Sequence, residues 1–61
     1  MPSLTQKELM ALDDQLNQEQ LLVKKFRSYA STAQDGQLRM LCEQQAKRHK
    51  QHYDTLMGYL Y

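Results

Sequence analysis

The chain has 61 residues, with eight Lys plus Arg against seven Asp plus Glu, so its formal net charge is +1. A charge this small attracts neither nucleic acid nor acidic membranes strongly, and no apolar run approaches the ~20 residues that span a bilayer. We therefore expect no nucleic acid and no membrane among its partners. Two Gly, one Pro and no Trp favour continuous helices, which predicts one all-α domain over residues 1–61.

A first helix is predicted over about residues 6–33. Thr5 and Glu8 have the spacing of a capping box, in which Thr5 caps the helix and Glu8 bonds back to the Thr5 amide. Apolar residues then recur at alternating spacings of three and four, which is typical of a helix face packed against a partner. This face consists of Leu9, Leu12, Leu16, Glu19, Val23, Phe26, Ala30 and Ala33. Glu19 is its only charged member.

The only turn signal in the interior of the chain is at residues 34–36, Gln-Asp-Gly. Asp35 is placed to cap a second helix over about residues 37–57. Two long helices joined by so short a turn must lie antiparallel, so the levels of facing residues follow by reflection about the turn. This reflection predicts, for example, that Phe26 faces Cys42. The sequence therefore predicts an antiparallel two-helix hairpin.

The apolar surface of this hairpin is wider than one partner helix can cover. On the second helix it spreads over more than the ~100° that a helix shows to a single core. So short a chain also buries too little surface to be comfortably stable alone. Both observations predict a homodimer in which two hairpins form a four-helix bundle. The residues expected in its core or interface are Leu9, Leu12, Leu16, Val23, Phe26, Leu38, Leu41, Cys42, Tyr53 and Leu56.

Glu19, His49 and His52 form the candidate site. A carboxylate on a packed helix face loses hydration, so it needs a hydrogen-bond donor, a cation or a metal. Reflection about the turn places Glu19 at the level of the two histidines, which lie three residues apart on one helical face. Imidazole and carboxylate ligands suit zinc, iron, manganese or copper. Two interpretations are open: a transition-metal site, and a hydrogen-bonded structural cluster with no cofactor.

Catalysis is a weaker interpretation of the same residues. A carboxylate beside a histidine can act as an acid–base pair. A two-helix hairpin, however, offers no cleft and no oxyanion donors, and Cys42 lies about two turns from His49, too far to be a nucleophile beside its base. We therefore do not expect an enzyme.

The N-terminus and the cysteine content predict a cytoplasmic protein. No basic segment is followed by an apolar one near the N-terminus, so we expect no signal peptide. The single cysteine, Cys42, excludes an intramolecular disulfide and fits a reducing compartment.

Four segments together resemble the small spore-coat proteins related to coat protein F. They are residues 4–9, 16–20, 26–30 and 49–56, and their order and spacing extend the resemblance over nearly the whole chain. The resemblance implies a ferritin-like helical hairpin of endospore-forming bacteria, located in the mother cell and then in the spore coat, with other coat proteins as partners. We therefore expect a structural or assembly protein of the spore coat. The alternatives are a small metal-binding or redox-protective ferritin-like protein and a helical protein–protein adaptor.

The resemblance also bears on the candidate site. Ferritin-like metal proteins usually place a Glu on one helix and Glu-x-x-His on the next. In this sequence Glu19 matches the first, and His49-x-x-His52 occupies the second with His in place of Glu. The bridging carboxylates that hold two irons together are therefore missing, and what remains is a single-metal or relic site.

Overall fold

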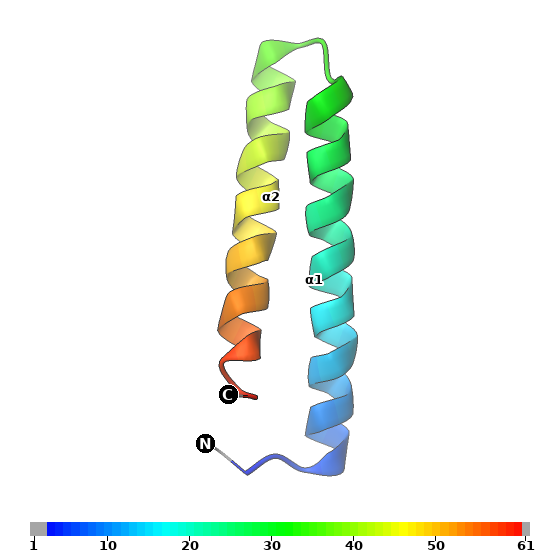
Figure 1. Cartoon of the computed structure of the whole chain (residues 1–61), viewed down its shortest axis with the longest axis vertical. Coiled ribbons are helices and arrows are strands. Elements are labelled where there is room, and N and C mark those ends of the chain that lie inside the picture. The colour runs from blue at the N-terminus through cyan, green and yellow to red at the C-terminus, as the bar shows by residue number, and fades with distance from the viewer. Residues whose placement is uncertain (1–2, 61) are drawn as a thin grey trace.

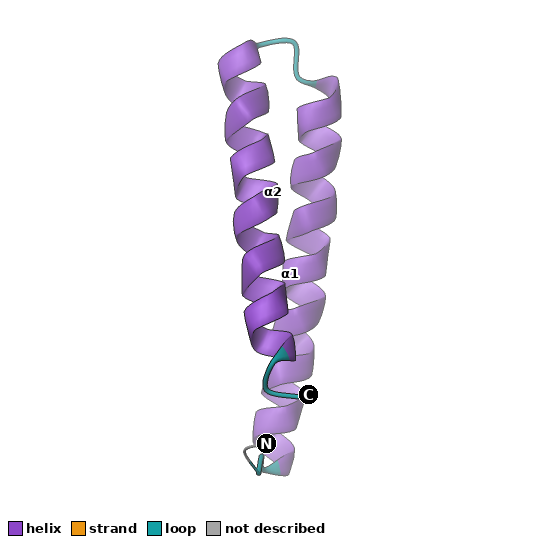
Figure 2. Cartoon of the chain, turned by 60° about the vertical axis from the view of Figure 1, so that its left-hand side comes forward, coloured by secondary structure: helices purple, strands orange, loops and turns teal. Residues whose placement is uncertain are grey.

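The structure is a computed structural model that describes residues 3–60 as two long helices joined by a short turn (Figure 1). Helix α1 comprises Gln6–Thr32 and helix α2 comprises Gly36–Met57. The two helices run antiparallel, and no strand occurs within residues 3–60 (Figure 2). The predicted all-helical hairpin is confirmed. Within the same residues, neither helix is long and apolar enough to cross a membrane.

Capping side chains determine where the helices begin. The Thr5 hydroxyl accepts a hydrogen bond from the Glu8 amide at 3.1 Å, and the Glu8 carboxylate accepts one from the Thr5 amide at 2.9 Å. The hydrogen bond from the Thr5 amide to the carboxylate, aided by the Thr5 hydroxyl beside it, holds the pKa of Glu8 below its usual value. At the second helix, the Asp35 carboxylate accepts a hydrogen bond from the Leu38 amide at 2.8 Å. Both caps occupy the positions that the sequence predicts.

The turn lies one residue earlier than predicted, at residues 33–35 instead of 34–36. Ala33 is extended, so α1 ends at Thr32, and Asp35 is the extended N-cap, which makes Gly36 the first residue of α2. No residue in the described range, glycine or otherwise, has a positive φ. The backbone therefore does not require a glycine at position 36. Arg39 adds a bond across the turn by donating to the Ala33 carbonyl at 2.8 Å.

The hairpin has a thin core because only one layer of side chains fits between two helices. The buried apolar residues are Leu16, Val23 and Ala30 on α1 and Cys42 and Ala46 on α2. Other predicted core residues are only half-buried, namely Leu12, Phe26, Tyr53 and Leu56. Leu9, Leu38 and Leu41 are exposed and do not belong to the core of the single hairpin. Leu9 lies at a level of α1 beyond the end of the shorter α2.

The two broad sides of the hairpin differ in chemistry. Helical spacing places a set of mainly apolar residues on one side, which we call the apolar face. It comprises Leu12, Gln15, Glu19, Leu22, Phe26 and Tyr29 of α1, Leu38, Leu41, Gln45, His49, His52 and Leu56 of α2, and Tyr59 just after α2. The opposite side carries an open groove lined by Arg27, Ala30, Ser31, Arg39, Glu43, Ala46, Lys47, Lys50 and Gln51. The candidate site thus lies on the less charged side.

Candidate metal centre

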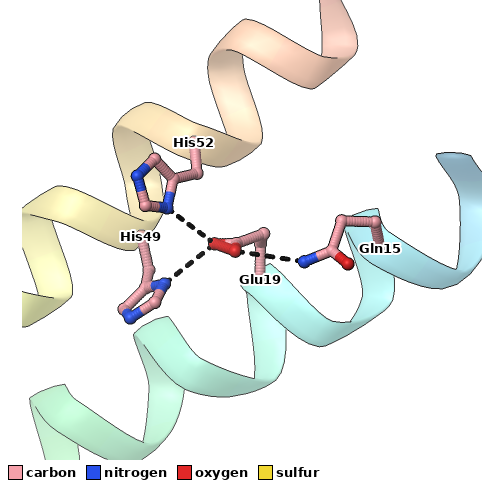
Figure 3. Close-up of polar contacts among 4 residues, drawn as sticks. All are labelled: Gln15, Glu19, His49 and His52. Carbon is pink, nitrogen blue, oxygen red and sulfur yellow. Dashed lines mark hydrogen bonds and ion pairs between the residues drawn. The ribbon is translucent and has the colours of Figure 1, made fainter.

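Glu19, His49 and His52 come together halfway along the hairpin (Figure 3). Glu19 is the middle residue of α1, and its side chain crosses to α2, where the histidines occupy successive turns. The Glu19 side chain is 6% exposed, that of His49 18% and that of His52 50%. The cluster is therefore closed on the α1 side and reaches solvent at His52.

Both histidines direct the same ring atom at the same carboxylate oxygen. His49 Nδ1 lies 2.9 Å from Glu19 Oε2, within hydrogen-bond distance, and His52 Nδ1 lies 3.4 Å from it. The other oxygen, Oε1, accepts a hydrogen bond from the Gln15 amide at 3.3 Å. An ionised carboxylate only accepts hydrogen bonds, so the His49 imidazole is the donor of the 2.9 Å bond, and His52 is at ion-pair distance. Each oxygen of Glu19 thus has its own partners.

These contacts decide the ionisation of Glu19. Burial raises the pKa of its carboxyl, which alone would favour the neutral acid. The hydrogen bond from His49, the charges of His49 and His52 and the Gln15 amide act in the opposite sense, and together they hold the pKa below its usual value. Glu19 is therefore a nearly buried carboxylate that stays ionised at neutral pH. No buried side-chain polar atom in the described part of the chain lacks a partner.

Aromatic contacts hold the His49 ring. The ring lies parallel to that of Phe26, with centroids 5.8 Å apart and an interplanar angle of 3°. Tyr29 meets Phe26 edge-on at 6.2 Å, and His52 meets His49 edge-on at 5.4 Å. With Glu19 on one nitrogen and Phe26 against its face, His49 has little freedom to turn.

The stacking of Phe26 on His49 differs from the simple reflection, which predicts Cys42 as the residue facing Phe26. Side chains on a helix lean toward its N-terminus. In an antiparallel pair, Phe26 therefore leans away from the turn while His49 leans toward it, so their rings meet although their backbones lie at different levels. Cys42 itself is buried, as a free thiol.

The donor set can be tested against the metal sites of ferritin-like proteins. A group of three metal-ligating residues occurs at this point, Glu19, His49 and His52, whose ligand atoms all lie within 4.8 Å of one another. It contains one carboxylate. Glu43, the nearest acidic residue before the histidines in the sequence, is exposed and lines the groove on the opposite side. The described residues therefore do not fit a carboxylate-bridged di-iron centre, whereas two imidazoles and one carboxylate do fit a single transition-metal ion.

Sequence reasoning missed two residues that shape this cluster. Gln15 lies four residues before Glu19, the spacing at which side chains meet on a helix, and that spacing was a usable signal. The role of Phe26 had no such signal, because its stacking depends on how the two helices pack. Tyr53, predicted to be in the core, is half-buried, and its hydroxyl accepts a hydrogen bond from Gln20 at 3.3 Å.

Comparisons of the chain with protein-family models, with curated proteins and with solved structures found no match.

Proposed function

We propose that this protein is a non-enzymatic assembly protein that acts as a homodimer, with two hairpins packed through their apolar faces into a ferritin-like four-helix bundle. The observation that carries the proposal is the contrast between the two sides of the hairpin. Four large side chains of the apolar face are half-exposed in the single chain: Tyr29, Leu38, Leu41 and Tyr59. Around them, Leu12, Leu22, Phe26 and Leu56 are only half-buried. A monomer would leave these apolar side chains, which lie around the central polar cluster, in water.

A second copy has the right size and shape to cover the apolar face. The hairpin is elongated, with extents of 46, 16 and 12 Å, so a second hairpin laid along its broad side can cover the apolar face over its whole length. Two identical elongated faces close on each other about a twofold axis, which leaves no further copy of the face exposed. The resulting assembly has four helices packed around one core, which is the architecture of a helix bundle.

Charge supports the choice of the apolar face as the interface. Between the levels of Leu12 and Tyr29, Glu19 is its only acidic residue, and that carboxylate already has partners within its own chain. The opposite groove carries four basic residues against one acidic residue, Glu43; the basic ones are Arg27, Arg39, Lys47 and Lys50. Two copies of that basic side would repel each other. Self-association through the apolar face buries apolar surface without this repulsion.

The spore coat as the place of action follows from the resemblance to the spore-coat proteins related to coat protein F. We propose that the dimer is made in the mother-cell cytoplasm and is then incorporated into the coat with other coat proteins. A small, closed helical bundle with a charged outer side suits a structural component. The absence of enzyme activity is part of the same proposal; burial of the one thiol, Cys42, supports it only for chemistry that would use a cysteine nucleophile.

Two experiments test these proposals separately. Sedimentation equilibrium at micromolar concentration should give twice the 7.2 kDa chain mass, and a folded monomer across that range would refute the dimer. In a sporulating host, an epitope-tagged chain should accumulate in the mother cell and then fractionate with the spore coat. Equal abundance in cells that do not sporulate would contradict the coat proposal but leave the dimer untouched.

A further inference from the structure

We infer that Glu19, His49 and His52 bind one zinc-type divalent ion per chain, and that this ion strengthens the dimer because its site opens onto the apolar face. Ion binding itself rests only on the geometry of one hairpin. Its coupling to dimerisation rests on the proposed function. The two parts therefore have separate tests.

The positions of the donor atoms carry the inference. In a tetrahedral zinc site with bonds of about 2.0–2.1 Å, neighbouring ligand atoms lie roughly 3.3 Å apart. Glu19 Oε2 lies 2.9 Å from His49 Nδ1 and 3.4 Å from His52 Nδ1, so both separations bracket that value. The three ligand atoms lie within 4.8 Å of one another, close enough for one ion to bind all three. Two imidazoles from successive turns and a carboxylate from the facing helix thus converge on one point.

The surroundings of the site suit a bound ion. Gln15 holds Oε1 of Glu19, which leaves Oε2 directed at the histidines, and such outer hydrogen bonds orient ligands in known metal sites. The Phe26 ring fixes the plane of His49. His52 is half-exposed, so an ion has a path from solvent and a water molecule has room to be the fourth ligand. Three protein ligands plus one open position is the usual composition of an accessible zinc site.

The ligand types select among metals. Imidazoles favour zinc, cobalt, nickel and copper over magnesium and calcium, which prefer oxygen ligands. One carboxylate cannot bridge two irons, so the site departs from the di-iron centres of ferritin-like proteins. The binding of a single ion by two histidines and one carboxylate is therefore inferred from this chain and is not a property carried over from those proteins.

The place of the cluster connects the ion with the dimer. Glu19 is the middle residue of α1, so a twofold axis through the centre of the apolar face brings the two clusters opposite each other. The partner would then cover His52, the exposed side of the site. An ion that binds the covered site more tightly than the open one stabilises the dimer by that ratio of affinities at each of its two sites.

Ion binding is tested with untagged protein that has been treated with EDTA and dialysed. Cobalt(II) should give the visible absorption of a tetrahedral ion that saturates at one equivalent per chain, and zinc should displace it. Glu19→Gln and His52→Gln should abolish this absorption, while Gln15→Ala should weaken binding by the roughly 10- to 100-fold typical of an outer partner. Glu43→Gln is the matched control, because it removes an equal charge from an exposed position on the opposite side.

The design keeps each outcome decisive. Circular dichroism should show that His52→Gln keeps its helices, since half of the side chain is already in water; this variant decides the test if Glu19→Gln unfolds. The site is overturned if folded wild type takes up no cobalt or zinc, or if His52→Gln binds as wild type does.

The coupling is tested by sedimentation in EDTA and in zinc. Zinc should lower the dimer dissociation constant of the wild type and leave that of His52→Gln unchanged. A dimer that binds no zinc overturns the site but not the self-association. A monomer that binds zinc overturns the self-association but not the site, and a dimer that binds zinc with no change in its dissociation constant overturns the coupling.

Discussion

Replacing Leu41 with Ala should weaken the proposed dimer and leave the hairpin itself intact. Leu41 belongs to the apolar face and is 52% exposed in the single chain, so it contributes little to the core between α1 and α2. Its sequence neighbour Met40 is 60% exposed but points about 100° away around the helix, off the apolar face. Leu41→Ala and Met40→Ala therefore form a matched pair with similar effects on helix propensity.

The size of the effect follows from the exposed area. Truncation of Leu to Ala removes three carbon atoms, each worth about 0.8 kcal/mol when fully buried. About half of the side chain is available for burial by a partner, which gives roughly 1.2 kcal/mol per copy. A twofold dimer loses this contribution twice, so the dissociation constant should rise by roughly 50-fold. Met40→Ala should change it by less than about threefold, within the usual range for surface substitutions.

Sedimentation velocity over a concentration series measures both dissociation constants, and circular dichroism checks that helix content is unchanged. Two outcomes would refute the proposed interface. If Met40→Ala weakens the dimer as much as Leu41→Ala does, the interface is not the apolar face. If neither variant changes the dissociation constant, Leu41 is not buried by a partner.

Three further predictions concern the single hairpin. Gly36→Ala should raise the free energy of unfolding by about 0.4–1 kcal/mol, because a Cβ at Gly36 meets nothing within 4 Å and its φ is not positive; a lower melting temperature would contradict the assigned turn. Leu16→Ala should lower that free energy by about 2–5 kcal/mol in urea denaturation, since Leu16 is buried between the helices, and a loss below 1 kcal/mol would place it outside the core. In EDTA, NMR titration of the Glu19 carboxyl should give a pKa below the usual 4.5. Because the pKa of Glu19 is lower in the folded state, the ionised carboxylate stabilises the fold at any pH above its unfolded-state pKa, and this contribution is lost as the pH falls through the folded-state pKa. The difference in stability between the wild type and Glu19→Gln should therefore shrink over that pH range. A pKa above 4.5 would show that burial outweighs the histidines.

Much of the fold could be predicted because it depends on local rules. Thr5 and Asp35 begin the helices by accepting hydrogen bonds from amides three residues ahead, and such short-range bonds can be predicted from spacing. A three-residue turn forces the second helix to run back along the first. The meeting of Glu19 with His49 and His52 then follows from level and face: an antiparallel pair brings residues equidistant from the turn to one level, and helical spacing puts these three on facing sides.

The burial of individual side chains and their contacts could not be predicted, because they depend on the distances between the two helices. The sequence marks Leu9, Leu38 and Leu41 as apolar, but only the packed pair shows that Leu9 lies beyond the end of α2 and that the single inner layer has no room for Leu38 and Leu41. Likewise, the stacking of Phe26 on His49 and the choice of Oε2 as the oxygen that both histidines approach are set by side-chain directions across the helix gap. Periodicity determines which residues share a face. The tertiary structure decided how deeply each one is buried and which atoms meet, because burial and contact depend on the axial and lateral fit of two helices that no local pattern records.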